Sequence, residues 1–224
     1  MAKNFNHPQV VESYDEHIRK LIPGYELIHL QVHALLKARL PERAEVLVVG
    51  CGTGHELCYL AAQFPHWRFT AIDPAQNMLE KAKVRLESEN LATHVQFLHS
   101  DTSGLSHTAQ KFDAALSILV SHFIPETEKK FYFQDIYHAL KDQAVCLSYD
   151  LMQIENIQQL KTLQHLAELT GLSEKQSQAM IERLQDDFCL ISNQELHQLL
   201  RHIGFKSVEN FAQVLNYFGT FAVK

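Results

Sequence analysis

Features that would place a chain outside the cytoplasm are missing from this sequence. No apolar run approaches the roughly 18–20 residues of a membrane span, and the start of the chain, MAKNFNHPQV, lacks the apolar stretch of a signal peptide. The four cysteines form no Cys-x-x-Cys pair and follow no disulfide framework. We therefore expect reduced thiols in a cytoplasmic protein that does not bind membranes.

An excess of positive charge is also missing, and this limits the partners. The 20 Lys and Arg residues against 26 Asp and Glu residues give a formal net charge of −6, which argues against nucleic acid as a partner. The 14 histidines form no metal-ligand pattern: His29 and His33 are four apart, but without the glutamate of a His-Glu-x-x-His motif. We expect no metal site.

The chain has the length and the alternating pattern of a single α/β domain. Its 224 residues are 46% hydrophobic, enough for one sizeable core. Strand patterns alternate with helical ones, which predicts a mostly parallel, Rossmann-like sheet ending in an antiparallel hairpin. The expected strands are 46–49, 68–72, 94–98, 112–119, 143–149, 205–211 and 214–222, and the expected helices include 10–22, 25–39, 54–63, 74–87 and 126–140.

This single domain divides into four expected parts. Residues 1–40 form a helical cap, and residues 41–150 form the core of the sheet. Two further helical patterns make residues 151–188 an insertion, which we expect to lie as a lid over the carboxyl ends of the strands. Residues 189–224 supply a helix, which begins with a capping box at Ser192 and Glu195 and ends at Gly204, and then the hairpin.

A strand, a glycine turn and a helix follow one another in residues 46–56, VLVVGCGTGHE. Asp73 comes nineteen residues after Gly54, at the end of the next apolar run. This order predicts half of a nucleoside-binding site. The dinucleotide fingerprint G-x-G-x-x-G needs a third glycine at position 55, which holds His55. The spacing present, G-x-G-x-G, is typical of sites for S-adenosylmethionine (SAM) and makes a nicotinamide dehydrogenase a remote alternative.

Each residue of this motif has a chemical role in such a site. Backbone N–H groups at the start of a helix face an anionic group, which in SAM is the methionyl carboxylate. A Cβ at Gly50 or Gly52 would occupy the space of the ligand, and Asp73 can accept hydrogen bonds from both ribose hydroxyls. The alternative is a glycine turn that serves only strand–helix packing, with Asp73 capping a helix.

The ends of the third and fourth expected strands supply the other half of the site. Asp101 can accept a hydrogen bond from the adenine amino group, and Thr102 can add a backbone contact. Ser117, near the end of the fourth strand, would border the middle of the ligand. Asp101 has the alternative role of a solvated loop acid.

The segment SILVSHFIP brings Ser121, His122 and Phe123 to the place where a reacting methyl group would point. A general base is needed only when the acceptor must lose a proton, and imidazole exchanges protons near neutral pH. His122 is therefore the candidate base; the alternative is a loop histidine without a catalytic part. Weaker candidates are Tyr14, Tyr149 and Asp150.

The order of these motifs resembles the class I SAM-dependent methyltransferases over nearly the whole chain. Within that superfamily the chain most resembles the carboxy-S-adenosylmethionine synthase group, which is related to tRNA wobble-uridine modification. The matching stretches are Tyr14-Asp15, IPGYELI (22–28), VLVVGCGTG (46–54), TAIDPAQNMLEKAK (70–83), FDAALSILVSHFIPETEKK (112–130) and the tail from 199.

This resemblance implies SAM as the cofactor, S-adenosylhomocysteine (SAH) as its product, and the class I methyltransferase fold. A possible homodimer is implied by this resemblance alone. The cofactor-binding residues that it implies are Tyr25, Gly50, Cys51, Gly52, Gly54, Asp73, Pro74, Met78, Asp101, Thr102 and Ser117. On the substrate side it implies Tyr14, Ser121 and Phe123.

One position departs from the synthase group. That group uses an arginine on the penultimate helix to bind the extra carboxylate of its product, and the aligned position here is Leu199. Arg201 lies two residues on, roughly 200° around the helix. The sequence therefore favours plain SAM and a methyltransferase that acts on a small-molecule acceptor. The alternatives are a carboxy-SAM synthase and a SAM-binding protein without turnover.

Overall fold

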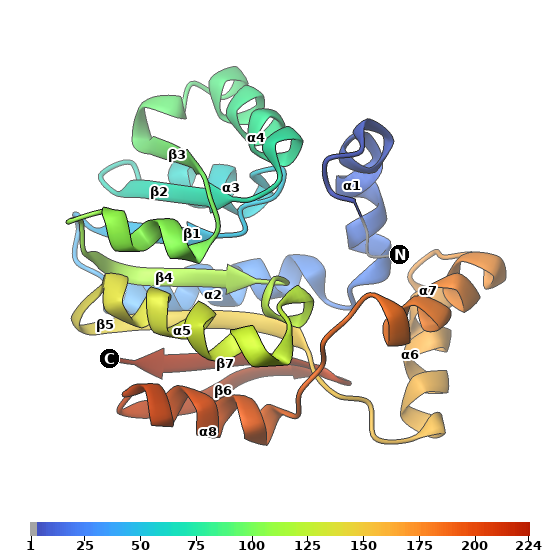
Figure 1. Ribbon diagram of the computed structural model, residues 1–224. Coiled ribbons are helices and arrows are strands. Elements are labelled where there is room, and N and C mark those ends of the chain that lie inside the picture. The colour runs from blue at the N-terminus through green and yellow to red at the C-terminus, as the bar shows by residue number, and fades with distance from the viewer. Residues whose placement is uncertain (1–3) are drawn as a thin grey trace.

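The computed structural model describes residues 4–224, except for the side chains of residues 185 and 186. One seven-stranded sheet runs through the molecule, in the order β3-β2-β1-β4-β5-β7-β6 (Figure 1). The strands are β1 (Glu45–Val49), β2 (Arg68–Asp73), β3 (Val95–His99), β4 (Phe112–Ile118), β5 (Leu140–Leu151), β6 (Ser207–Val214) and β7 (Tyr217–Val223). The first five are parallel, and β7 lies antiparallel between β5 and β6. The predicted fold class is confirmed.

Helices cover both faces of the sheet. The α-helices are α1 (Pro8–Leu21), α2 (Tyr25–Arg39), α3 (His55–Gln63), α4 (Gln76–Ser88), α5 (Glu126–Ala139), α6 (Ile157–Leu169), α7 (Glu174–Asp186) and α8 (Asn193–Ile203). Three short 3₁₀ helices are η1 (Ala92–His94), η2 (Thr102–His107) and η3 (Ser121–Phe123). The capping box predicted at Ser192 and Glu195 is present at the start of α8.

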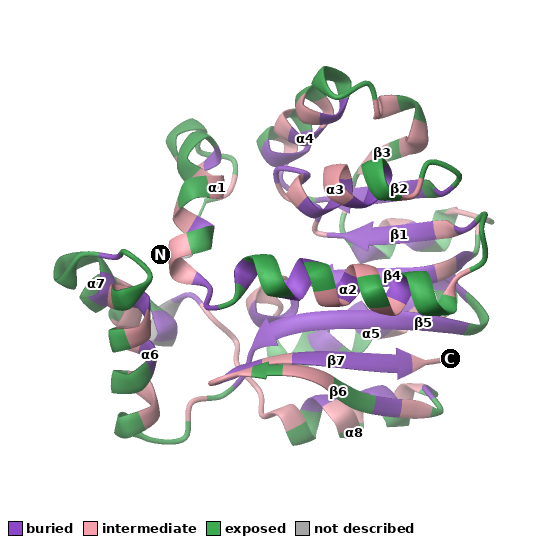
Figure 2. Ribbon diagram, turned by 180° about the vertical axis from the view of Figure 1, so that it is seen from behind, coloured by how far each residue is buried: buried purple, intermediate pink, exposed green. Residues whose placement is uncertain are grey.

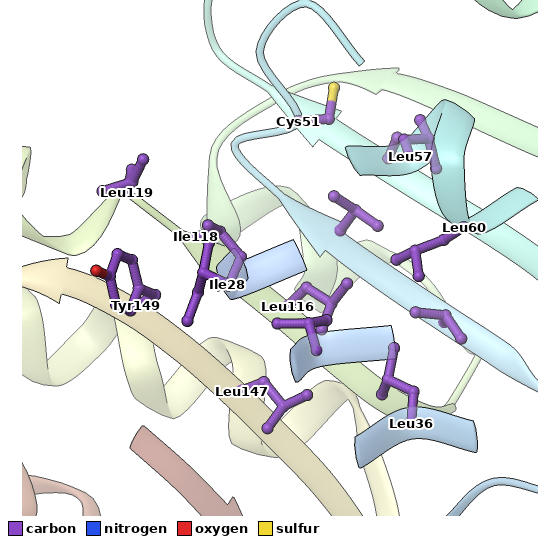
Figure 3. Packing of buried hydrophobic residues seen from close by; sticks show 14 of the residues in the cluster. Ile28, Leu36, Cys51, Leu57, Leu60, Leu116, Ile118, Leu119, Leu147 and Tyr149 are labelled. Carbon is purple, nitrogen blue, oxygen red and sulfur yellow. The ribbon is translucent and has the colours of Figure 1, made fainter. Parts of the chain in front are cut away.

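The two faces of the sheet bury two separate apolar clusters. Leu47 of β1 and Phe133 of α5 belong to the cluster under α5 and α8. Val46 and Leu57 belong to the cluster under α2, α3 and α4, and Figure 3 shows side chains of α2 and α3 packed against those of β4 and β5. Because both faces are covered, the central strands are apolar at nearly every position (Figure 2).

One helix start differs from the sequence-based expectation. We expected Pro74 in the first turn of the helix, but α4 begins at Gln76 and Ala75 is its N-cap. The carboxyl of Asp73 accepts a hydrogen bond from the Ala75 N–H at 2.8 Å. This contact holds residues 73–75 in an extended bend between β2 and the helix, so the helix starts two residues later.

The sheet order reverses between β1 and β4, whose carboxyl ends lie side by side. In parallel sheets a ligand crevice forms at such a reversal. Helices α1, α6 and α7 lie at the same end of the sheet (Figure 1). No helix in the described part of the chain is both long enough and apolar enough to cross a bilayer.

Candidate active site

The turn after β1 is a loop of backbone groups held against β2. Gly50, Gly52 and Gly54 have φ angles of 66°, 52° and 74°, in the left-handed region that favours glycine. The N–H groups of Gly50 and Cys51 both donate to the carbonyl of Ile72, at 2.8 and 3.1 Å. The loop is therefore fixed in place before any ligand binds.

The three glycines of the loop have different surroundings. A Cβ built on Gly52 would meet no atom within 4 Å, so this position borders open space. A Cβ on Gly54 would lie 2.9 Å from the Cβ of Ala82, so Gly54 is needed for packing α3 against α4. A Cβ on Gly50 would lie 2.5 Å from a methyl of Val120. A side chain at Gly50 would therefore meet Val120, and the expectation that it would also occupy the ligand space stays a prediction.

Asp73 is oriented by two backbone donors. Its side chain accepts hydrogen bonds from the N–H groups of Gly52 and Ala75, both at 2.8 Å. The residue is 7% exposed, and burial raises the pKa of its carboxyl while the two N–H groups oppose that shift. Each carboxylate oxygen still has an acceptor site for a ligand hydroxyl.

A cleft with about 600 Å³ of empty space opens beside this loop. We call it the glycine-loop cleft. It is lined by Phe5, Tyr14, Gly50, Gly52, Asp73, Pro74, Ala75, Met78, Leu119, Val120, Phe123 and Ile124. Its wall is apolar apart from the glycine backbone, Asp73 and Tyr14, which suits a flat heterocycle that carries a few hydroxyl groups.

A second, smaller space lies on the other side of the same loop. This polar cleft is lined by Tyr14, Tyr25, His29, Gly50, Cys51, Gly52, Thr53, His55, Glu56, Ile118 and Leu119. The rings of Tyr25 and His55 stack, with centroids 5.7 Å apart. Glu56 is 8% exposed, and burial raises the pKa of its carboxyl to about 8.

Helix α1 is tied to the glycine loop through Asp15. The hydroxyl of Thr53 and the guanidinium of Arg85 both donate to its carboxylate. Burial raises the pKa of Asp15, but these two donors outweigh it and lower the pKa overall. This link positions the neighbouring Tyr14 over the clefts. Burial, and then the charge of Asp73, raises the pKa of the Tyr14 phenol, which keeps it protonated.

The largest of the three clefts lies under α1 and α7. This apolar cleft holds about 940 Å³ of empty space and is lined by Phe5, Tyr14, His17, Ile18, Leu21, Ile22, Leu119, His122, Phe123, Leu151, Gln176, Ala179, Met180, Arg183, Leu184, Phe188 and Tyr217. Its lining comes from α1, η3, α7 and the ends of β4, β5 and β7. Most of its wall is aliphatic or aromatic, which suits an apolar molecule.

His122 belongs to a buried polar network at the edge of the apolar cleft. Its Nδ1 lies 2.8 Å from a carboxyl oxygen of Asp150, and the hydroxyl of Ser121 donates to the other oxygen at 2.8 Å. His122 is 6% exposed and Asp150 is 1% exposed. An ionised carboxylate can only accept, so Nδ1 carries the proton and Nε2 is left as an acceptor.

Lys129 supports this network from α5. Its ammonium donates to the carbonyl oxygens of Ser121 and Ile124 and is itself buried. Burial lowers the pKa of Lys129, and the negative charge of Asp150 opposes that change. Sequence reasoning assigned no role to Lys129 or Glu56, because neither lies in a recognisable spacing; the fold places Lys129 against the turn that carries His122, and Glu56 in the polar cleft.

Tyr14 and Leu119 line all three clefts, so the clefts meet at these two residues. Leu119 follows β4 directly and has a φ of 61°. A branched side chain rarely adopts this conformation, and such strain gathers at functional positions. Figure 3 shows Leu119 beyond the end of β4, with Cys51 above the end of β1.

Comparisons with known proteins agree on one superfamily. Residues 46–143 match the methyltransferase domain family. Carboxy-S-adenosyl-L-methionine synthase of Desulfotalea psychrophila is 25% identical, over 96% of this chain and 90% of the relative. The chain is similar to members of the class I SAM-dependent methyltransferase superfamily. SAM is the cofactor of that superfamily, as the sequence predicts.

Solved structures of methyltransferases share this fold. Magnesium protoporphyrin IX methyltransferase of Synechocystis PCC 6803, with bound SAH, superposes with a TM-score of 0.64 at 16% identity, covering 92% of this chain and 85% of that one. An O-methyltransferase family protein from Burkholderia thailandensis gives a TM-score of 0.71 at 13% identity and 98% coverage of this chain. This chain spans about three fifths (61%) of the length of that protein.

The residues present fit SAM. Gly52 borders open space where a Cβ would intrude, and Asp73 lines the adjoining cleft with free acceptor sites on a fixed carboxyl. Tyr25 and Cys51 line the polar cleft, and Pro74 and Met78 line the glycine-loop cleft. Tyr14 and Phe123 of the substrate side line the apolar cleft, whereas the hydroxyl of Ser121 is turned to Asp150.

Four predicted cofactor residues line none of the clefts described above: Gly54, Asp101, Thr102 and Ser117. Ser117 is fully buried and hydrogen-bonded to Tyr132 at 2.7 Å, which places its side chain in the core. Thr102 is buried, and its hydroxyl donates to Asp135. Asp101 is exposed and caps η2 by accepting from the N–H and hydroxyl of Ser103.

The C-terminal helix places no cation at the clefts. Leu199 packs against the apolar cluster under α5 and α8, and the guanidinium of Arg201 donates to the carbonyl of Val208 at 3.1 Å. Neither residue lines any of the three clefts. Among the described residues no group of three or more His, Cys, Asp or Glu side chains could hold a metal.

Proposed function

We propose that this protein transfers the methyl group of SAM to an apolar small molecule. The observation that carries the proposal is the meeting of a glycine-loop cleft and an apolar cleft at Tyr14 and Leu119, beside the His122–Asp150 pair. Bound SAM supplies a methyl group on a sulfonium that is already a good leaving group. The chain's own part is to align the acceptor and to exclude water.

The residues of the chain divide this work between them. Asp73 and the glycine loop hold the nucleoside and its amino-acid tail, and Phe5 and Phe123, whose rings contact at 5.1 Å, form part of the wall of both the glycine-loop and apolar clefts. His122 Nε2 accepts a proton from an acceptor hydroxyl or amine, and Asp150 stabilises the imidazolium that results. Lys129 holds the turn that carries His122, because it donates to the carbonyl oxygens of Ser121 and Ile124, and Asp150 orients the His122 ring through Nδ1.

A carboxy-SAM synthase is the second candidate, because relatives bear that name. The extra carboxylate of its product needs a cationic partner. No lysine or arginine is among the described residues that line the glycine-loop cleft or the polar cleft, and Leu199 and Arg201 lie elsewhere. These observations favour plain SAM.

Two measurements test the proposal. Mass spectrometry of the co-purified nucleoside, with calorimetry of SAM and SAH, should identify plain SAM or SAH at micromolar affinity; a carboxylated sulfonium would establish the synthase instead.

The second measurement follows SAH release with a panel of apolar phenols and amines. His122→Asn should lower kcat by roughly 10²- to 10⁴-fold with unchanged SAH affinity. The exposed His107→Asn serves as the matched control, and SAM binding without turnover on any acceptor would point to a non-catalytic protein.

A further inference from the structure

The polar cleft contains a carboxyl group that the proposed methyl transfer does not use. Glu56 is the second residue of α3, directly after the glycine loop, and it lines the cleft. The residue Glu56 as a whole is 8% exposed. It makes no hydrogen bond with the described residues, and its ion-pair contact is His29 Nε2, 3.8 Å from Oε2. A buried carboxyl without a donor is costly unless it stays protonated or gains a cation.

The histidine beside Glu56 does not supply that cation. Nδ1 of His29 lies 2.6 Å from the carbonyl of Tyr25, which can only accept, so Nδ1 carries the proton of the neutral ring. Burial lowers the pKa of His29, so the ring is neutral at pH 7 and its Nε2 is an acceptor. Two acceptors then face each other across the cleft, unless Glu56 holds a proton.

The other groups around Glu56 are neutral near pH 7 as well. Burial raises the pKa of the Tyr14, Tyr25 and Cys51 side chains and lowers the pKa of His55. Beyond His55, Arg19 and Glu26 pair with each other at 2.7 Å. The residues of α1, α2, the glycine loop and α3 that line the cleft therefore carry no full charge that could balance an ionised Glu56. The end of β4 contributes only the apolar residues Ile118 and Leu119 to this lining.

We propose that Glu56 binds the ammonium group of the amino-acid tail of SAM, giving up its own proton as the ligand enters. The inference rests on the proposed SAM site. The start of α3 presents N–H groups to the carboxylate of the tail, and Glu56 lies next to them on the same cleft wall. An α-amino acid offers a carboxylate and an ammonium one carbon apart, which matches these two neighbouring features.

This arrangement makes the binding of SAM depend on pH. The pKa of Glu56 is raised to about 8 in the free protein, so at pH 7 most molecules carry the proton there. Binding of a ligand with an ammonium group then releases about one proton. Below pH 8 the affinity should fall about tenfold for each pH unit, since the proton competes with the ammonium.

The test uses calorimetry of SAH with the full chain in buffers of different ionisation enthalpy. Wild-type protein should release about one proton at pH 7, and its affinity should drop about tenfold from pH 7.5 to 6.5. Glu56→Gln, which keeps the shape of the protonated carboxyl, should release none and bind SAH roughly 10- to 100-fold more weakly at pH 8. Glu89→Gln, at an exposed glutamate on the far end of α4, should behave as wild type.

Two further ligands separate this inference from the SAM site itself. The deamino analogue of SAH should bind wild type roughly 10- to 100-fold more weakly than SAH, and Glu56→Gln should not distinguish the two. Methylthioadenosine, which lacks the tail, should bind both proteins equally. If SAH binds wild type without proton release and Glu56→Gln binds it as tightly, the role of Glu56 is refuted while the SAM site stands. If none of these nucleosides binds wild type, the SAM site itself is wrong.

Discussion

The glycine-loop cleft and the apolar cleft meet at Tyr14 and Leu119, but they are built in different ways. The glycine-loop cleft depends on backbone groups and one fixed carboxyl at the ends of β1 and β2. Most of the apolar cleft's wall is made of side chains from α1, α7 and η3. A site made of strand ends is fixed by the sheet, whereas a site made of helix faces depends on how those helices pack. The first suits a constant cofactor and the second a particular acceptor.

The two glycines that follow Cys51 in the loop should respond very differently to replacement by alanine. Gly54→Ala should lower the free energy of unfolding by about 3 kcal/mol, because its Cβ would overlap Ala82 of α4. Gly52→Ala should cost only about 1 kcal/mol, for its positive φ, but should weaken SAH binding strongly. Denaturant unfolding and calorimetry give both numbers. Equal losses of stability would mean that the loop has no side facing a ligand.

A variant of Glu56 tests whether this residue lowers the free energy of unfolding while it favours the binding of SAM. Its pKa is raised from 4.5 to about 8 in the fold, so its protonation stabilises the native state below pH 4.5 and that contribution is lost as the pH rises to 8. Glu56→Gln should therefore be more stable than wild type at pH 8.5, by about 4–5 kcal/mol, and equally stable at pH 4.5. Urea unfolding across this pH range measures the difference; a constant difference at all pH values would contradict the assignment.

Alanine variants of Asp73 and Asp101 should distinguish a carboxylate that contacts the cofactor from one that caps a loop. Asp73→Ala should weaken the binding of SAM and SAH by roughly 1.5–3 kcal/mol, the cost of a lost charged hydrogen bond. Asp101→Ala should change it by less than about 0.5 kcal/mol, because Asp101 is exposed and bonded to Ser103. Calorimetry with both ligands decides. Equal weakening by the two variants would restore Asp101 to the adenine contact that the family resemblance implies.

The wall of the apolar cleft should be more tolerant than the core. Leu184→Ala should lower the free energy of unfolding by about 1–2 kcal/mol, because Leu184 faces empty space on one side. Leu57→Ala, under α3 with 0% exposure, should cost about 3–4 kcal/mol. SAH affinity should stay within about twofold in Leu184→Ala. A loss of SAH binding there would show that the two clefts are not separable.

Local sequence patterns were enough for the sheet and for half of the site. The bounds of α2 are those expected, the starts of β2 and β4 are also those expected, and the other strand starts differ by one to three residues. Asp73 and the glycine turn were found because strand, turn and helix are contiguous, so their spacing alone fixes the geometry. The side chain of Ser117 is buried against Tyr132, and alternation along β4 does not tell which of two covered faces a small polar residue enters.

What the sequence determined by itself was therefore the order of the sheet elements, the glycine turn and the class of cofactor. The packing of distant elements decided the rest. Only the fold pairs His122 with Asp150 and places the ammonium of Lys129 against the carbonyl of Ser121. Only the fold encloses Glu56 between α1 and α2. These contacts join residues far apart in the chain, and their energies come from burial, which no local pattern records.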